Sequence, residues 1–149
     1  MLRLEKLTIK AQEALQEAQE VAARHDHQQI EPMHLLAALL LQTDGVVRPL
    51  LTRLGVSPEA LTRDVDLALE RFPKVTGVGQ QHMGQALNEL FEKAFAEAGK
   101  FHDEYVSSEH LLLAMADLGH DPVTELLKRH GASRDAILQA LTSVRGSVH

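Results

Sequence analysis

Histidine is the residue type in this chain best suited to metal binding or acid–base catalysis, and the nine histidines are unevenly spread along the sequence. The densest group is His25-Asp26-His27, which places two imidazoles and a carboxylate, all metal-ligand types, within three residues. Residues i and i+2 of a helix point to different faces, so the two rings do not converge on one ion. The group also falls where a helix is predicted to end, and His suits the carbonyl end of a helix dipole. The spacing therefore favours a helix end, and we expect no bound metal.

A second pair of histidines is related by an internal repeat. His34 and His110 each stand three residues after a predicted helix cap, and each is followed by Leu-Leu. A duplicated catalytic site would need a repeated partner, but Met33 precedes one ring and Glu109 the other. The repetition instead predicts a structural role, as a cap or as a hydrogen bond within the core. A small hydrolase or metal protein built on the histidines is the competing interpretation.

Motifs for nucleotide binding or nucleophilic catalysis do not occur in the sequence. Gly77-Val78-Gly79 is not followed by the Lys that a phosphate loop needs, and Gly-x-Ser-x-Gly and His-Glu-x-x-His are both missing. The absence of Cys excludes disulfides, thiol catalysis and Cys-ligated zinc. We therefore expect a non-catalytic domain without a cofactor of its own.

Composition narrows the class of partner. The 149 residues fit one domain, which we place at residues 1–149. A net charge of −6, with basic residues scattered among carboxylates, disfavours nucleic acids and anionic membranes. The N-terminus lacks the apolar stretch of a signal peptide, and the longest apolar run, Leu35–Leu41, is far shorter than the roughly 20 residues of a membrane span. We expect a soluble, cytoplasmic protein that binds other proteins.

The elements that must position these residues form a duplicated unit. A shift of 76 residues aligns Leu7 with Met83 and continues without a gap to Val65. Chance would rarely keep His, Gly and capping Ser residues in register together, so the duplication is a strong signal. The matched positions in the two best blocks include His34 with His110, Leu35 with Leu111, Leu50 with Leu126, Gly55 with Gly131, and Ser57 with Ser133.

Each copy is predicted to contain four helices, which makes the fold an all-α, eight-helix bundle with pseudo-twofold symmetry. Apolar spacing predicts the first helix of each copy at about 8–24 and 84–100. We place the first copy at about 7–72, a linker at about 73–82 and the second copy at about 83–146. Residues suited to helix ends mark the other boundaries: Pro32 and Ser107 begin the second helices, Gly55 and Gly131 end the third, and Ser57 and Ser133 cap the fourth.

Positions where the copies differ are the place to look for function. Phe95 stands opposite Gln19, Phe101 opposite His25, and Glu109 opposite Met33. The two aromatic residues are able to line an apolar groove for an extended peptide, rimmed by carboxylates such as Asp103 and Glu109. Alternatively they fill the interface between the copies, which we favour for Phe101 and leave open for Phe95.

The duplicated unit resembles the Clp N-terminal repeat, and the whole chain is similar to the N-terminal domains of ClpB-type AAA+ disaggregases. The stretch Arg71–Gly77 favours the ClpB branch over the ClpA and ClpC branches. The other stretches that carry the resemblance are Leu7–Leu15, His25–Leu36 and Tyr105–Ala114. The resemblance implies a domain that engages unfolded or aggregated polypeptide and passes it to AAA+ modules outside this chain.

The same resemblance implies site residues. Thr8, Asp103 and Glu109 match surface positions implicated in substrate handling, and Phe91 and Phe95 would contribute to a neighbouring apolar groove. Lys93 and Glu97 lie on the same helix where relatives can carry apolar residues, which predicts a smaller or more polar groove.

The resemblance also implies cofactors and partners for the full-length protein. The cofactors are ATP and magnesium, and the partner is a DnaK-type chaperone system acting through other domains. The full-length protein would assemble into a homohexamer, whereas the isolated domain would be a monomer. Residues 143–149 resemble the start of a linker to the first ATPase module. The alternative is an adaptor- and substrate-docking domain of a Clp protease regulator of the ClpA or ClpC branch.

Overall fold

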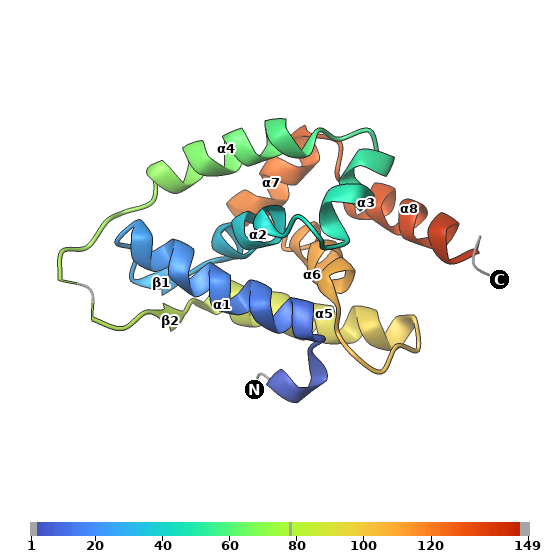
Figure 1. Cartoon of the computed structure of the whole chain (residues 1–149), viewed down its shortest axis with the longest axis horizontal. Helices are drawn as coiled ribbons and strands as arrows, with labels where there is room; N and C mark the ends of the chain where they lie inside the picture. The colour runs from blue at the N-terminus through green and yellow to red at the C-terminus, as the bar shows by residue number, and fades with distance from the viewer. Residues whose placement is uncertain (1–2, 78, 147–149) are drawn as a thin grey trace.

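Eight α-helices and a short 3-10 helix dominate the regular structure of residues 3–77 and 79–146, the residues described by the computed structural model (Figure 1). The first copy comprises η1 (Leu4–Lys6), α1 (Ile9–Arg24), α2 (Pro32–Leu41), α3 (Val47–Arg53) and α4 (Pro58–Glu70). The second comprises α5 (Gln85–Lys100), α6 (Ser108–Met115), α7 (Pro122–Arg129) and α8 (Arg134–Gly146). The predicted all-α, eight-helix class is confirmed.

Helix boundaries follow local capping chemistry. Thr8 caps α1 by accepting the N–H of Ala11, and Pro32 opens α2 where its missing N–H costs no hydrogen bond. After α3 and α7 the chain turns at Gly55 and Gly131, whose φ values of 86° and 87° lie in the left-handed region that glycine tolerates. The predicted helix ends at these glycines are confirmed.

Backbone pairing between the copies obeys the same pseudo-twofold relation. The two-residue strands β1 (Gln29–Ile30) and β2 (His82–Met83) pair in parallel, with Ile30 opposite Met83. Leu7 forms a parallel bridge with Val106, and the 76-residue repeat maps one pair onto the other. Each copy's N-terminal segment therefore pairs with the connection between the first two helices of the other copy. His82 belongs to β2, so the predicted linker at 73–82 overlaps a strand by one residue; the domain boundaries stay a prediction.

The core lies around α2 and α6, which the other helices surround (Figure 1). Residues Pro32–Leu40 of α2 and nearly all of α6 are buried, as expected for helices that are apolar on every side. Among the described residues, no helix combines the length and apolar character that a membrane crossing requires.

Candidate functional site

A left-handed residue ends the first helix of each copy and aims the next side chains inward. Asp26 and His102 both have φ of 59°, an uncommon conformation for residues other than glycine. In the first copy this turn brings His27 Nδ1 to 2.8 Å from His34 Nε2. In the second copy it brings Asp103 Oδ2 to 2.8 Å from His110 Nε2. We call these two pairs the first and second clasps, because each ties a helix end to the helix that follows.

Both inner histidines also cap their helices. The main-chain N–H of Glu31 donates to His34 Nδ1 at 2.8 Å, and that of Ser107 donates to His110 Nδ1 at 2.9 Å. The predicted structural role of His34 and His110 is confirmed. Because Nδ1 accepts a hydrogen bond in each ring, Nε2 must carry the hydrogen that the ring donates across the clasp.

Ser107, His110 and Asp103 contain the residue types of a hydrolytic triad. The Ser107 hydroxyl lies 3.0 Å from His110 Nδ1, and Asp103 lies on the other side of the ring. However, the Nδ1 lone pair already accepts the Ser107 main-chain N–H, so it is not available to take a proton from the hydroxyl. This geometry is that of a helix cap.

The first clasp is electrically neutral and deeply buried. His34 is 0% exposed, and burial lowers its pKa from 6.5 to about 3. Burial also lowers the pKa of His27, whose Nε2 has no hydrogen-bond partner among the described residues. His25 stacks on His27, and Phe72 contacts both rings of the clasp. Within residues 3–77 and 79–146, no group of three or more His, Asp or Glu side chains is arranged to hold a metal ion.

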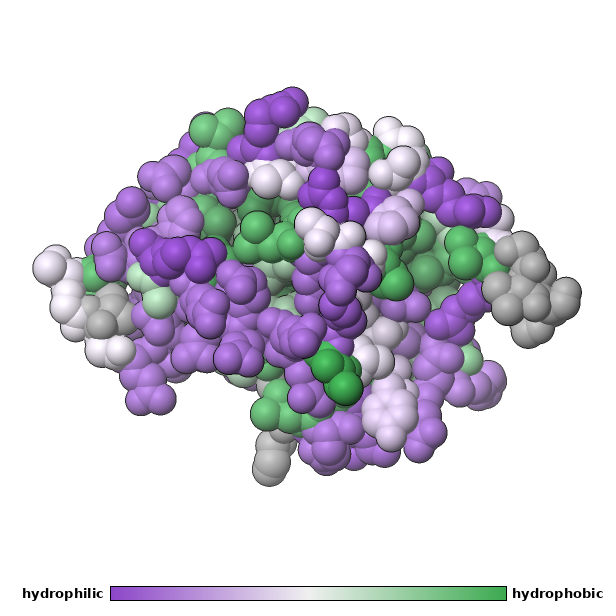
Figure 2. Space-filling model, viewed as in Figure 1, coloured by the Kyte–Doolittle hydropathy of each residue, from purple (hydrophilic) through white to green (hydrophobic). Residues whose placement is uncertain are grey.

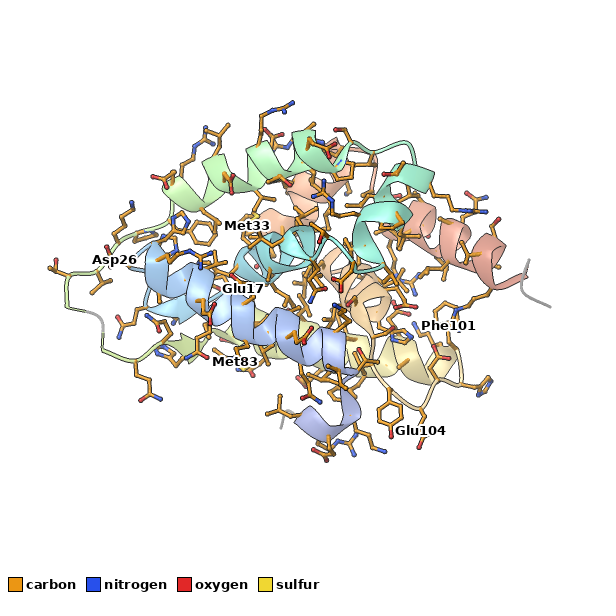
Figure 3. All side chains as sticks on the ribbon, viewed as in Figure 1. Glu17, Asp26, Met33, Met83, Phe101 and Glu104 are labelled. Atoms are coloured by element: carbon orange, nitrogen blue, oxygen red, sulfur yellow. The ribbon has the colours of Figure 1, made fainter. Side chains whose placement is uncertain are left out.

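The second clasp is ionic and extends to α8. Arg145 forms hydrogen bonds to both carboxylate oxygens of Asp103, at 3.2 and 2.7 Å. Its hydrogen bond is the main cause that lowers the pKa of Asp103, with His110 adding to the effect. The Arg145 guanidinium also lies 4.2 Å from the ring centroid of Phe101, the residue that ends α5 (Figure 3). Phe101 packs against the core beside His110 and Arg145, both in the second copy, so its expected place at the interface between the copies stays a prediction.

An apolar groove lies beside the second clasp. It has a volume of about 390 Å³ and runs between α3, α8 and the first turn of α6, where Glu109 stands on its wall. Figure 2 shows hydrophobic surface in this region, bordered by hydrophilic atoms. Its lining residues are Gly45, Val46, Pro49, Leu50, Arg53, Glu109, Leu141 and Val144.

The predicted site residues occupy different environments. Thr8 contacts the α5–α6 connection, of which Asp103 is part, because its main-chain N–H donates to the Val106 carbonyl at 2.9 Å. Phe91 is 2% exposed and belongs to the core, so it presents no surface to a peptide in this conformation. Phe95 is half-buried beneath the Arg3 guanidinium, 5.4 Å from its ring centroid. A role for these residues in binding stays a prediction.

The expectation that Glu97 makes a groove more polar is wrong. Glu97 is 3% exposed and forms two hydrogen bonds of 2.8 Å with Arg134 at the start of α8. The first copy has Val21 and Pro58 at the equivalent positions. The pair therefore stabilises the contact of α5 with α8 and adds no polar surface to a groove.

A profile of the Clp repeat (R) N-terminal domain family matches residues 6–130. The chain belongs to this family. The Clp repeat domain described here is 41% identical to the chaperone protein ClpB of Vibrio cholerae over 97% of the chain. It is 34% identical to ClpB of Clostridium perfringens over 98% of the chain. The chain spans only 17% of the length of either relative.

Solved structures share the fold of this Clp repeat domain. The Hsp104 N-terminal domain from Candida albicans superposes with a TM-score of 0.81 at 25% identity, covering 95% of this chain and 93% of that one. The ClpV N-domain in complex with a VipB peptide gives 0.74 at 21% identity, covering 92% and 89%.

Two features of the site, the groove and Arg53, were not predicted from the sequence. The groove between α3 and α8 joins segments about 95 residues apart, so no local pattern indicates it. Arg53 was overlooked because it resembles any exposed helix residue. The mismatch of Glu109 with Met33 was the one available signal.

Proposed function

We propose that this chain is the polypeptide-binding N-terminal domain of an ATP-dependent disaggregase chaperone. It engages unfolded or aggregated segments and passes them to AAA+ modules outside the chain. The observation that carries the proposal is the apolar groove between α3, α6 and α8, because an open apolar surface with a polar rim suits extended hydrophobic segments.

The relatives support this choice. The curated relatives are ClpB chaperones, and the ClpV N-domain, which has the same fold, forms a complex with a VipB peptide. The proposal includes a non-catalytic domain without a cofactor of its own. For the full-length protein we propose ATP and magnesium, a DnaK-type chaperone as partner, and a homohexamer.

Docking of adaptors in a Clp protease regulator is the alternative function. The two differ in the coding sequence downstream of this domain. A long coiled-coil insertion in the first ATPase module favours the disaggregase, whereas a protease-docking loop in the second module favours the regulator.

Amide resonances recorded during titration with a reduced, carboxymethylated protein test the groove. We expect shifts at groove residues such as Val46, Leu50 and Leu141, and weaker binding by Val46→Asn. Val46 is 51% exposed, so its replacement should leave stability nearly unchanged. Leu67→Asn on α4, at a position 59% exposed outside the groove, is the matched control. The absence of shifts at millimolar ligand, or equal weakening by both variants, would contradict the site.

A further inference from the structure

The groove between α3, α6 and α8 carries a charged residue where the other copy has an apolar one. The repeat relates Glu109, Leu141 and Leu50 of the groove to Met33, Val65 and Leu126. Leu50 and Leu141 are buried like their counterparts, whereas Met33 is 1% exposed and Glu109 is half-buried. Met33 belongs to the first turn of α2, on the side toward α4, and its side chain is part of the core (Figure 3). A carboxylate cannot fill that role without an unfavourable loss of hydration, so Glu109 leaves its side of the groove accessible.

Opposite charges stand on two walls of this groove. Arg53, at the end of α3, is exposed and has no ion pair or hydrogen bond from its side chain among the described residues. Glu109, on the first turn of α6, is half-buried, and within residues 3–77 and 79–146 it likewise forms neither. Other arginines near the groove are already engaged, because Arg48 pairs with Glu59 and Arg145 with Asp103. Glu109 interacts with Arg145 only through its charge, which adds to the raised pKa of that arginine.

Apolar side chains from two elements share the lining with these two charges. Val46, Pro49 and Leu50 come from α3 and the segment before it, whereas Leu141 and Val144 come from α8. The volume of about 390 Å³ falls in the range of roughly 300–1,000 Å³ that pockets use to hold small ligands. It suits a few side chains of a segment and not a folded surface.

We infer that the groove selects short aliphatic segments of unfolded polypeptide that carry an acidic residue at one end and a basic residue at the other. The acidic residue pairs with Arg53 and the basic residue with Glu109, while the aliphatic residues fill the apolar floor. This inference rests on the proposed polypeptide binding and adds the charge pattern of the occupant. A segment with the same charge at both ends places one of its charges beside a groove residue of the same sign, and this repulsion lowers the affinity of the segment.

Three blocked peptides with the same aliphatic centre, Leu-Val-Leu, test this pattern. They carry Asp and Lys, two Asp, or two Lys at the flanks, and binding is measured by fluorescence anisotropy at 0.15 M salt. At that ionic strength screening acts over about 8 Å, so the overall negative charge of the domain contributes little. The mixed peptide should bind about two- to fivefold more tightly than either like-charged peptide, the range expected for exposed ion pairs.

Reversing the charge of Arg53 or Glu109 should change which peptide binds most tightly. Arg53→Glu should favour the peptide with two Lys, Glu109→Lys the peptide with two Asp, and the double variant should again favour the mixed peptide. Arg63→Glu and Glu20→Lys change the net charge equally at exposed positions outside the groove, and they should keep the parent's order. Thermal unfolding establishes that each variant is folded.

The outcomes separate this inference from the proposed function. If the parent binds none of the peptides and no unfolded protein, polypeptide binding itself is wrong. If all three peptides bind equally, or if the charge reversals leave the order unchanged, polypeptide binding stands and the charge pattern is wrong.

Discussion

The first clasp should make the domain sensitive to acid. His34 is fully buried, and burial lowers its pKa to about 3, compared with the ordinary value of 6.5 in an unfolded chain. Between these two values the unfolded state binds a proton that the folded state does not, so stability is complete above pH 6.5 and falls as the pH approaches 3. The loss from His34 alone should reach about 2 kcal/mol at pH 5 and steepen to about 1.4 kcal/mol per pH unit.

Urea unfolding at a series of pH values between 7.5 and 4.5 measures this loss. His34→Gln is the informative variant, because Gln is a natural partner in a capping box, accepts the Glu31 N–H and does not titrate. It should be less stable than the parent at pH 7.5 but lose less stability on acidification. His120→Gln, at an exposed position, should keep the parent's pH dependence. Parallel curves for the parent and His34→Gln would refute the reasoning.

Two further predictions concern stability measured by the same denaturation. Arg134→Ala should cost about 3 kcal/mol because it leaves the Glu97 carboxylate buried without its main partner, whereas Glu97→Val should cost less, since the 24% exposed Arg134 can turn to water. Equal losses would contradict this asymmetry. Gly131→Ala should cost about 1 kcal/mol because its φ is 87°, but Gly99→Ala should be neutral or stabilise α5 by up to about 1 kcal/mol, as a Cβ there meets no atom within 4 Å. A similar loss of stability in both glycine variants would contradict this prediction.

The parts of this fold that depend on neighbouring residues were predictable. Ser57, Gly55 and Pro32 act within one helical turn, so their residue types alone indicate where helices begin and end. The repeat supplied the rest of the architecture, because a second copy in register must fold like the first. The left-handed turns at Asp26 and His102 were not predictable, since neither residue is a glycine and only the surrounding contacts hold them there.

The candidate site was harder to predict because its contacts join distant segments. Helical spacing placed Phe91 correctly on an apolar face but did not say whether another helix covers that face, and in the structure it is covered. Glu97 looked like a surface residue for the same reason. Its partner, Arg134, is 37 residues away and leaves no local pattern.

The two clasps explain why a duplicated unit tolerates different chemistry at the same place. The second copy can hold the Asp103 carboxylate there because Arg145 balances its charge. The repeat puts Leu69 at the position of Arg145, and this leucine is 1% exposed, so a carboxylate at residue 27 would be buried without the cation that Arg145 supplies in the second copy. His27 accepts the same hydrogen bond while remaining neutral. The first copy consequently has an uncharged clasp within the core, for which we expect the acid sensitivity described above. The second has an ionic clasp that ties the end of α8 to the α5–α6 connection, beside the groove in which Glu109 replaces Met33.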